Sequence, residues 1–318
     1  MLGNFIFSLN IVMPVFVLLL LGYILKKFEI TTPAFLASGN KIVFYVALPS
    51  LLFRGVYTTD IRTAVDFWFV GFALVSSIVA FFSIWGISRL FIKDRSIWGT
   101  FTQGAFRGSF ALVGIPLIIN LAGDAGMARA ALIVAFVVPF FNVFSVMALS
   151  SCAEKGKGEG LGLKSLLITI IKNPSNIAVF TGLFLAMFSI SLPSILETAI
   201  GNTANMATPL ALICLGGGMT FKGFDEKIRY ALIASLIKVV VLPLYFTIFG
   251  YIFGFRGYEL ATLMVLGGIP GAAVGYTMAT QMGGDTYVAG TIVIVTTLLS
   301  SVTLTLFIYV MRTIGLLV

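Results

Sequence analysis

The spacing of the apolar runs constrains this chain most, because ten of them are each long enough to cross a lipid bilayer. A transmembrane helix needs about 20 predominantly apolar residues. The predicted spans are 5–25, 36–57, 66–92, 97–120, 126–151, 165–189, 199–220, 229–254, 258–281 and 287–311. Of the 318 residues, 59% are hydrophobic and 10% are charged, which is more apolar surface than a soluble domain could bury. We therefore predict an all-α integral membrane protein with ten transmembrane helices.

Residues that the chain lacks exclude several classes of function. There is no histidine, which removes Ser-His and Cys-His catalysis and histidine-bound metals. The two cysteines, Cys152 and Cys214, form no ligand-spaced cluster, so no metal site is expected. No basic run is interleaved with aromatic residues, so nucleic-acid binding is not expected; the net charge of +8 is interpreted as loop charge facing an anionic leaflet. A membrane enzyme would need a deep acid–base or metal cluster, and none is visible.

Lysine and arginine in the predicted loops indicate the orientation of the chain. If the N-terminus is outside, the inner connections carry twelve Lys or Arg residues and the outer ones five. Because basic residues favour the cytoplasmic side, this bias predicts that both termini are outside. The longest connection, "SSCAEKGKGEGLGLKS", is then cytoplasmic and has the composition of a flexible linker. We expect a first five-helix unit over 1–152, a linker over 153–164 and a second unit over 165–318.

The two halves show a weak internal repeat. When the two halves are aligned at an offset of 161 residues, six positions are identical: Gly114/Gly275, Gly123/Gly284, Asp124/Asp285, Ala128/Ala289, Ile133/Ile294 and Val134/Val295. The stretch "VALPSLLF" at 46–53 also matches "MATPLALI" at 206–213 with its proline in register. Since five helices is an odd number, the second copy must start on the opposite face of the membrane. We therefore predict an inverted repeat, which is typical of secondary transporters.

The fourth and ninth spans contain their own helix breakers. The fourth has "RGSFALVGIP" and the ninth has "LGGIPGAAVGYT", with Pro116 and Pro270 near the middle. Proline removes a helical hydrogen bond, and backbone groups freed in hydrocarbon need protein or a water-filled cavity to satisfy them. Breaks in corresponding helices of the two halves indicate a binding site near the membrane midplane. The alternative is a pair of proline kinks with small residues for tight packing.

Two cations lie deep in predicted spans. Arg107 is about ten residues into the fourth span, or roughly 15 Å from its start, and Lys238 is similarly deep in the eighth. No acidic residue lies at comparable depth, since Asp124 and Asp285 fall at span ends and are expected to cap the following helices. The partner of these cations is either a bound anion or backbone carbonyls that hold them for structural reasons. Two deep cations without deep anions favour an anionic substrate.

The polar groups on or beside the broken helices complete the candidate site. The substrate-binding candidates are Arg107, Ser109, Gly114, Pro116, Asn142, Lys238, Pro270, Gly271, Tyr276 and Thr277. Gln103 and Gln281 are candidates for binding a coupling ion. Any one of these polar residues could instead make a hydrogen bond between helices.

At these residues the sequence resembles the auxin efflux carrier family of membrane transporters, in its short bacterial branch. The motifs are "ALPSLLF", "FRGSFALVGIPL" followed by "GDAG", "PFFN", "NPSNIAVFTGL", "IKVVVLP", "IPGAA" and "GGDTYVAGTIV", spread over the whole chain. The family is similar in fold to the bile acid/sodium symporters. Seven residues before the first crossover proline the family often has Asn, whereas this chain has Ser109, so auxin is not expected to be its substrate.

The resemblance implies ten helices in two inverted five-helix repeats, with helices 4 and 9 crossing at broken, proline-containing midpoints. It implies that Pro116 and Pro270 are the crossover prolines, that Arg107 is the basic residue before the crossover, and that Asn142 is a polar position of helix 5. Plant members form dimers, so a homodimer is open here. Bacterial relatives are associated with malonate, malate and similar organic anions, and the transport bundle is expected to move by an elevator-like or rocking motion.

From these observations we predict a secondary transporter in the cell (inner) membrane for a small organic anion: a mono- or dicarboxylate such as malonate or malate, or an auxin-like carboxylate. The coupling ion is open: Na⁺ could bind carbonyls and hydroxyls near the crossing, H⁺ usually needs a deep carboxylate that this chain lacks, and uniport or exchange needs neither. No cofactor is expected. The alternatives are a non-transporting sensor or lipid-binding receptor on the same fold, and a channel.

Overall fold

A computed structural model of the chain describes residues 2–58, 66–150, 174–218 and 227–317. Within these ranges the regular elements are helices, and no strand occurs apart from one isolated β-bridge. The expected linker at 153–164 and the start of the sixth predicted span lie outside the described residues. The all-helical prediction is therefore confirmed for the part of the chain that is described.

The helices follow the predicted spans, with five of the spans divided into shorter pieces. The first half contains α1 (Leu2–Lys27), α2 (Pro33–Ile42), α3 (Leu48–Tyr57), α5 (Phe67–Phe91), α6 (Arg95–Phe106), α7 (Ile115–Phe136) and α8 (Val138–Ser150). The second half contains α10 (Pro174–Met187), α11 (Ser194–Gly217), α12 (Ile228–Leu236), α13 (Leu242–Ile252), α14 (Gly257–Gly268), α15 (Ala273–Gln281) and α16 (Thr286–Thr313). Three π-helical turns lie between them: η1 (Val43–Ala47), η2 (Phe110–Gly114) and η3 (Ile237–Val241).

Six helical segments in the described residues are long and apolar enough to cross a membrane. They are Leu2–Lys27, Pro33–Tyr57, Phe67–Phe91, Gly126–Ser150, Ile228–Ile252 and Thr286–Thr313. The fourth and ninth predicted spans are not among them because each is interrupted, and only the later part of the sixth is described. α11 is long enough, at 24 residues, but its first half carries Glu197, Asn202 and Asn205.

Each π-helical turn lies immediately before a proline in the first turn of the next helix, namely Pro49, Pro116 and Pro243. Proline cannot donate a backbone hydrogen bond, and its ring clashes with the carbonyl four residues earlier. A π turn carries an extra residue and is a common way to bend a helix at such a point. These three prolines therefore bend their helices without interrupting them.

Asp285 begins α16, because its carboxylate accepts a hydrogen bond from the backbone N–H of Val288 at 2.9 Å. The predicted capping role of Asp285 is thus confirmed. The side chain of Asp124 is outside the described set, but Gly123 just before it has a φ of 57° that divides α7 into two helical parts. Only a residue without Cβ adopts this conformation readily, so the kink at "GDAG" is encoded locally.

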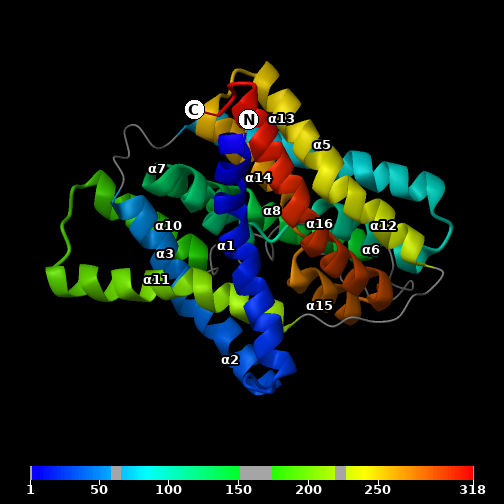
Figure 1. Cartoon of the computed structure of the whole chain (residues 1–318), viewed down its shortest axis with the longest axis horizontal. Helices are drawn as coiled ribbons and strands as arrows, with labels where there is room; N and C mark the ends of the chain where they lie inside the picture. Colours follow the sequence, from blue (N-terminus) through cyan, green and yellow to red (C-terminus); the bar gives the residue numbers. More distant parts are fainter. Residues whose placement is uncertain (1, 59–65, 151–173, 219–226, 318) are drawn as a thin grey trace.

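The helices form two groups that meet at α1 and α16. In Figure 1, α3, α10 and α11 pack together on the left, and α5, α6, α12 and α13 lie on the right. α1 contacts both α11 and α16 and so connects the groups. α1 and α11 cross closely because Gly22 and Gly216 have no side chain at the contact. A Cβ on either residue would overlap backbone atoms of the facing helix.

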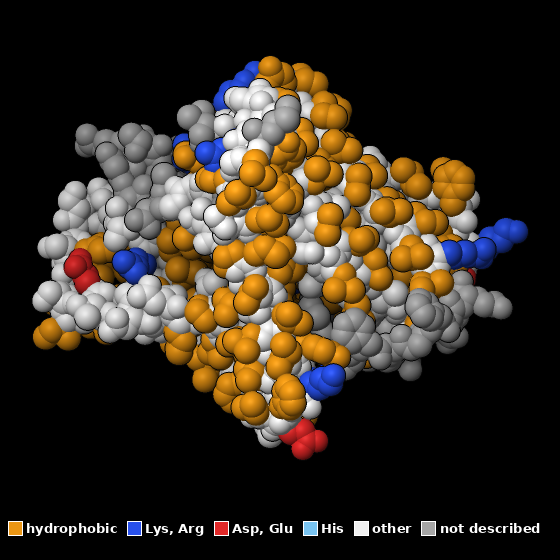
Figure 2. Space-filling view, in the orientation of Figure 1, with side chains coloured by type: hydrophobic (Ala, Val, Ile, Leu, Met, Phe, Trp, Pro, Cys, Tyr) orange, Lys and Arg blue, Asp and Glu red, His pale blue; other side chains and the backbone are white. Residues whose placement is uncertain are grey.

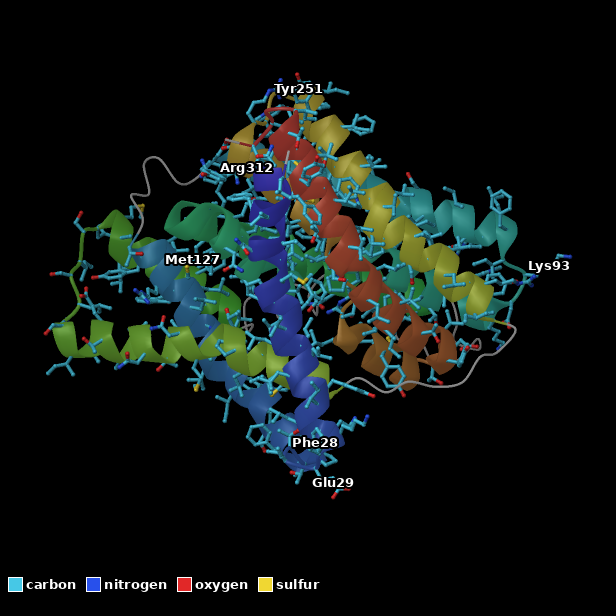
Figure 3. All side chains as sticks on the ribbon, in the orientation of Figure 1. Phe28, Glu29, Lys93, Met127, Tyr251 and Arg312 are labelled. Carbon is cyan, nitrogen blue, oxygen red and sulfur yellow. The ribbon has the colours of Figure 1, made fainter. Side chains whose placement is uncertain are left out.

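The surface of the molecule is largely apolar. Figure 2 shows hydrophobic side chains over most of one face, and large residues such as Phe67, Leu90 and Ile195 are among the exposed ones. Apolar surface on this scale is expected of a protein that contacts lipid. In Figure 3, Tyr251 and Arg312 lie near both ends of the chain, whereas Glu29 and Lys93 lie at two other extremities.

Candidate functional site

Two interrupted helices cross at the centre of the candidate site. α6 and α14 each have 12 residues. A short non-helical segment follows each of them, at 107–109 after α6 and at 269–272 after α14. Gly108 and Gly271 form an antiparallel bridge at this point, and the Ser109 N–H donates to the Pro270 carbonyl at 2.9 Å. A Cβ on Gly108 would lie 2.5 Å from Ile269 Cγ1, so only glycine allows this close approach. The predicted breaks in the fourth and ninth spans are present, and they touch.

The prediction that both crossover breaks contain the proline was wrong for the first half. Pro270 lies at the second break, but the first break is at Arg107–Ser109, and Pro116 is in the first turn of α7 beyond η2. The π turn accommodates Pro116, as described above, so the helix continues there. Gly114 also lies within η2, where a Cβ would contact the ring of Phe110 at 2.7 Å. Gly114 and Gly275, which match in the internal repeat, are not part of the bridge, which Gly108 and Gly271 form.

Arg107 is buried at the first break and is held by two other helices. Its Nη2 donates to Asn142 Oδ1 at 2.6 Å, and its Nη1 contacts Ser145 Oγ at 3.3 Å and Met278 Sδ at 3.0 Å. Only 8% of Arg107 is exposed, and among the described residues it makes no ion pair. Asn142 was selected from the sequence, whereas Ser145 was not, although it stands three residues later on the same face of α8.

Lys238 lies in η3 and is fully buried. Its Nζ donates to the carbonyls of Gly267 at 2.7 Å and Leu266 at 3.4 Å, which belong to the last turn of α14. A Cβ on Gly108 would be 3.0 Å from this Nζ, so the ammonium adjoins the crossing itself. The structure thus brings both deep cations of the sequence to the two sides of one crossing.

A small cavity adjoins the crossing. It is lined in part by Thr100, Gln103, Arg107, Gly271 and Tyr276, and its volume of about 10 Å³ is close to that of one water molecule by this measure. Gln103 is 2% exposed, and its Nε2 has no hydrogen-bond partner in the described part of the chain. A buried donor without a partner costs about 1–3 kcal/mol, so the cavity contains an unsatisfied polar group beside a cation.

The remaining predicted residues take different places. Ser109 contributes its backbone to the crossing and is buried, while Tyr276 lines the small cavity. Thr277 and Gln281 lie on α15, but their side chains are outside the described set. Thr296, which the sequence analysis missed, accepts a hydrogen bond from the Gly271 N–H at 2.9 Å and so fixes the crossing to α16.

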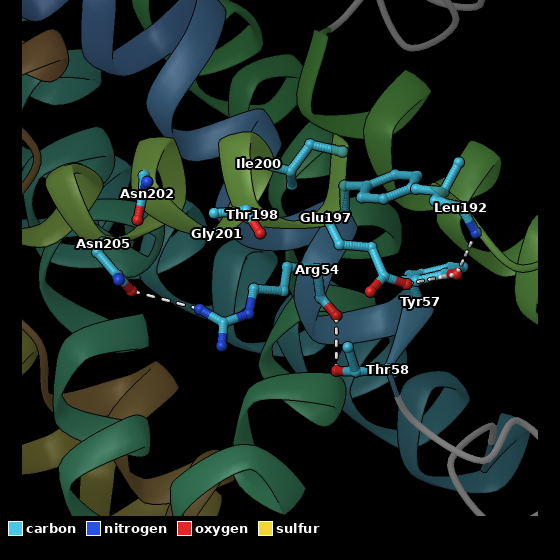
Figure 4. A pocket seen from close by; sticks show the side chains of 11 residues that line it. Arg54, Tyr57, Thr58, Leu192, Glu197, Thr198, Ile200, Gly201, Asn202 and Asn205 are labelled. Carbon is cyan, nitrogen blue, oxygen red and sulfur yellow. Dashed lines mark hydrogen bonds between the residues drawn. The ribbon is translucent and has the colours of Figure 1, made fainter. Parts of the chain in front are cut away.

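A larger, open cavity of about 400 Å³ lies between the end of α3 and the start of α11 (Figure 4). Arg54 Nη1 donates to Asn205 Oδ1 at 3.3 Å, and no carboxylate pairs with Arg54 in the described residues. Glu197 lies on the opposite wall, where it accepts a hydrogen bond from the Tyr57 hydroxyl at 3.1 Å. The sequence analysis did not select Arg54 as a site residue; the polar residues at every third or fourth position of α11 were the available signal.

The apolar helices and the central crossing of interrupted helices define an all-helical, multi-pass membrane protein. The family model described as "Membrane transport protein" matches residues 7–159 and 161–308. The chain therefore belongs to this family of membrane transport proteins, and the resemblance to the auxin efflux carriers is confirmed.

Full-length relatives agree with the family match. The "Uncharacterized transporter" of Methanothermobacter thermautotrophicus is 25% identical over 95% of this chain and 98% of its own. The "Putative malonate transporter" of Rhizobium meliloti is 26% identical over 95% of both chains. "Uncharacterized transporter YfdV" of Escherichia coli is 23% identical over 96% of this chain and 98% of its own. The family model and the printed names of these relatives all describe transport proteins.

Proposed function

We propose that this protein is a secondary transporter that carries a small organic anion, a mono- or dicarboxylate, by alternating access at the crossing of α6 and α14. The observation that supports this most is the pair of buried cations, Arg107 and Lys238, on the two sides of the crossing without a carboxylate partner in the described residues. Buried charges inside a membrane protein need a counter-charge or strong dipoles. A substrate carboxylate would supply the first of these to Arg107.

The donors at the crossing fit a carboxylate. Arg107 offers a planar guanidinium, and the unpaired Nε2 of Gln103 lines the same small cavity. α15 begins next to the cavity, since Ala272 and Gly275 line it, and the N-terminal end of a helix carries partial positive charge. Because the cavity of about 10 Å³ is too small for an organic acid, a movement of the helices must open it before the substrate can bind.

An inverted repeat would explain why the two breaks match. α6 and α14 have equal lengths, each is followed by a break that contains one of the bridged glycines, and each continues as a further helical segment. We propose that these elements correspond across two five-helix repeats, with both termini outside. In this arrangement the open cavity at Arg54 faces outwards, and it is a place where the anion would first meet the protein.

The relatives support the substrate class without defining it. One of them carries the printed name of a malonate transporter, and it covers the same length as this chain. The proposed function leaves open whether Na⁺, H⁺ or no ion is coupled to transport; a coupling cation would bind at the carbonyl ends of the interrupted helices, because helix C-termini carry partial negative charge.

Uptake into proteoliposomes tests the proposal. Labelled malonate, malate and indole-3-acetate would be offered to the wild type, to Arg107→Gln and to Arg229→Gln, which removes the same charge at an exposed position. We expect saturable uptake of at least one organic acid by the wild type and the Arg229 variant, and a loss of at least tenfold in the Arg107 variant. Absence of saturable uptake of any organic acid by the wild type would refute the proposed function.

A further inference from the structure

The carbonyl end of α14 already has a cation bound to it. α14 ends at Gly268, and the last carbonyls of any helix lack partners within the helix. At an interruption inside a membrane protein, bulk water does not satisfy them. Here the Lys238 ammonium is the hydrogen-bond donor for two of these carbonyls, those of Gly267 and Leu266.

The surroundings of Lys238 resemble those of a bound metal cation more than those of an ion pair. No aspartate or glutamate pairs with it in the described residues, where the ion pairs are Arg129–Glu259 and Lys227–Asp285. Its charge is instead stabilised by carbonyl dipoles at a helix C-terminus, which is how interrupted helices in transporters coordinate a coupling ion. The side chain is 0% exposed, so the ammonium has exchanged water for these carbonyls.

The ammonium also contacts the crossing. A Cβ on Gly108 would be 3.0 Å from Nζ, and Gly108 is bridged to Gly271 of the second interrupted helix. The charge therefore lies at the junction of the segments that must rearrange for the small cavity to open. A side chain of η3 supplies this charge permanently, whereas a free ion would have to enter and leave.

We propose that the Lys238 ammonium occupies the place at the crossing that a coupling cation would take, so that anion transport requires no Na⁺. This inference rests on the proposed function. Because the lysine stays with the protein, each completed cycle moves only the charge of the anion across the membrane. Transport is then electrogenic, and the membrane potential sets its direction.

The test uses wild type, Lys238→Ala, Lys238→Met and, as a control, Lys93→Met, which removes a charge from an exposed lysine. Malonate uptake would be measured in Na⁺ and in choline buffers. We expect wild type and the Lys93 variant to transport equally, within twofold, in both buffers. Lys238→Ala and Lys238→Met should lose at least tenfold in choline, and Lys238→Ala should recover at least threefold when Na⁺ or ethylammonium is added.

Thermal stability of the purified variants gives a readout that is independent of transport. Ethylammonium should raise the unfolding temperature of Lys238→Ala but not that of the wild type, and tetramethylammonium, which has no N–H and is bulkier, should raise neither. If Lys238→Ala does not fold, Na⁺-independent uptake by the wild type and the loss in Lys238→Met decide the question. Wild-type uptake that falls when Na⁺ is removed, or unchanged choline uptake in Lys238→Met, would overturn the inference. A wild type without any organic-acid uptake would refute the proposed function instead, and the stability measurement would still decide whether the site binds a cation.

Discussion

Replacing Thr296 by valine should destabilise the crossing more than any change of similar size nearby. Thr296 is fully buried, its Oγ1 accepts the Gly271 N–H at 2.9 Å, and the same hydroxyl donates to the Ile292 carbonyl at 2.6 Å. Valine has a similar shape but no acceptor, so the Gly271 N–H would be left unpaired. An orphaned buried donor costs about 1–3 kcal/mol, and 1.4 kcal/mol is a tenfold change in an equilibrium constant. We expect Thr296→Val to lower the folded-to-unfolded ratio roughly 5- to 150-fold.

The neighbouring Thr297 provides a matched control. It is 5% exposed, and its Oγ1 donates only to the Val293 carbonyl in the same helix, so Thr297→Val leaves no backbone N–H without a partner. Unfolding in mixed dodecyl maltoside–SDS micelles, followed by tryptophan fluorescence, would compare the two variants. Thr296→Ser, which keeps the acceptor, should stay close to the wild type. Equal stability losses in Thr296→Val and Thr297→Val would show that the Gly271 hydrogen bond does not hold the crossing.

Three further changes probe separate parts of the molecule. Asn142→Asp should place a carboxylate next to the Arg107 guanidinium and neutralise its charge. The thermal unfolding temperature should then rise, and organic-anion uptake should fall at least tenfold. Uptake equal to that of the wild type would contradict a substrate role for Arg107. Arg54→Gln should raise KM for uptake several-fold and leave kcat unchanged, as expected of a residue that binds the anion before the crossing opens. Gly216→Ala should cost about 1–3 kcal/mol through overpacking against the α1 backbone, whereas Gly71→Ala, with nothing within 4 Å of its Cβ, should be neutral in the same unfolding assay.

The sequence predicted those parts of the site that depend on local chemistry. Backbone groups freed in hydrocarbon need partners, so helix breakers in the fourth and ninth spans indicated that both are interrupted; the second break contains Pro270 as predicted, whereas the first lies at 107–109, before Pro116. A deep arginine needs polar partners, and Asn142 was identified as a polar group of the neighbouring span before its 2.6 Å contact with Arg107 was known. Asp285 was recognised as a cap because it follows two glycines and precedes an apolar run.

The parts that were missed depend on which helices face each other. Pro116 was assigned to the break because proline usually disrupts a helix, but a π turn of five residues takes up the distortion. Ser145, Met278 and Thr296 lie on three different helices, and only the packed structure shows that they converge on the crossing. An unaligned sequence gives the period of each helix but not its rotation towards its neighbours.

The sign of charge at the crossing follows from adding its contributions. Each interruption presents one helix C-terminus and one N-terminus, whose partial charges of about −0.5 and +0.5 cancel to first order. Side chains therefore decide the net field, and the described residues place Arg107 and Lys238 there without a paired carboxylate. Lys238 already donates to the C-terminal carbonyls of α14, so the positive charge left without an anionic partner is chiefly that of the Arg107 guanidinium. A site with that balance attracts an anion and repels a second free cation, so the same two residues support both the proposed substrate class and transport without Na⁺.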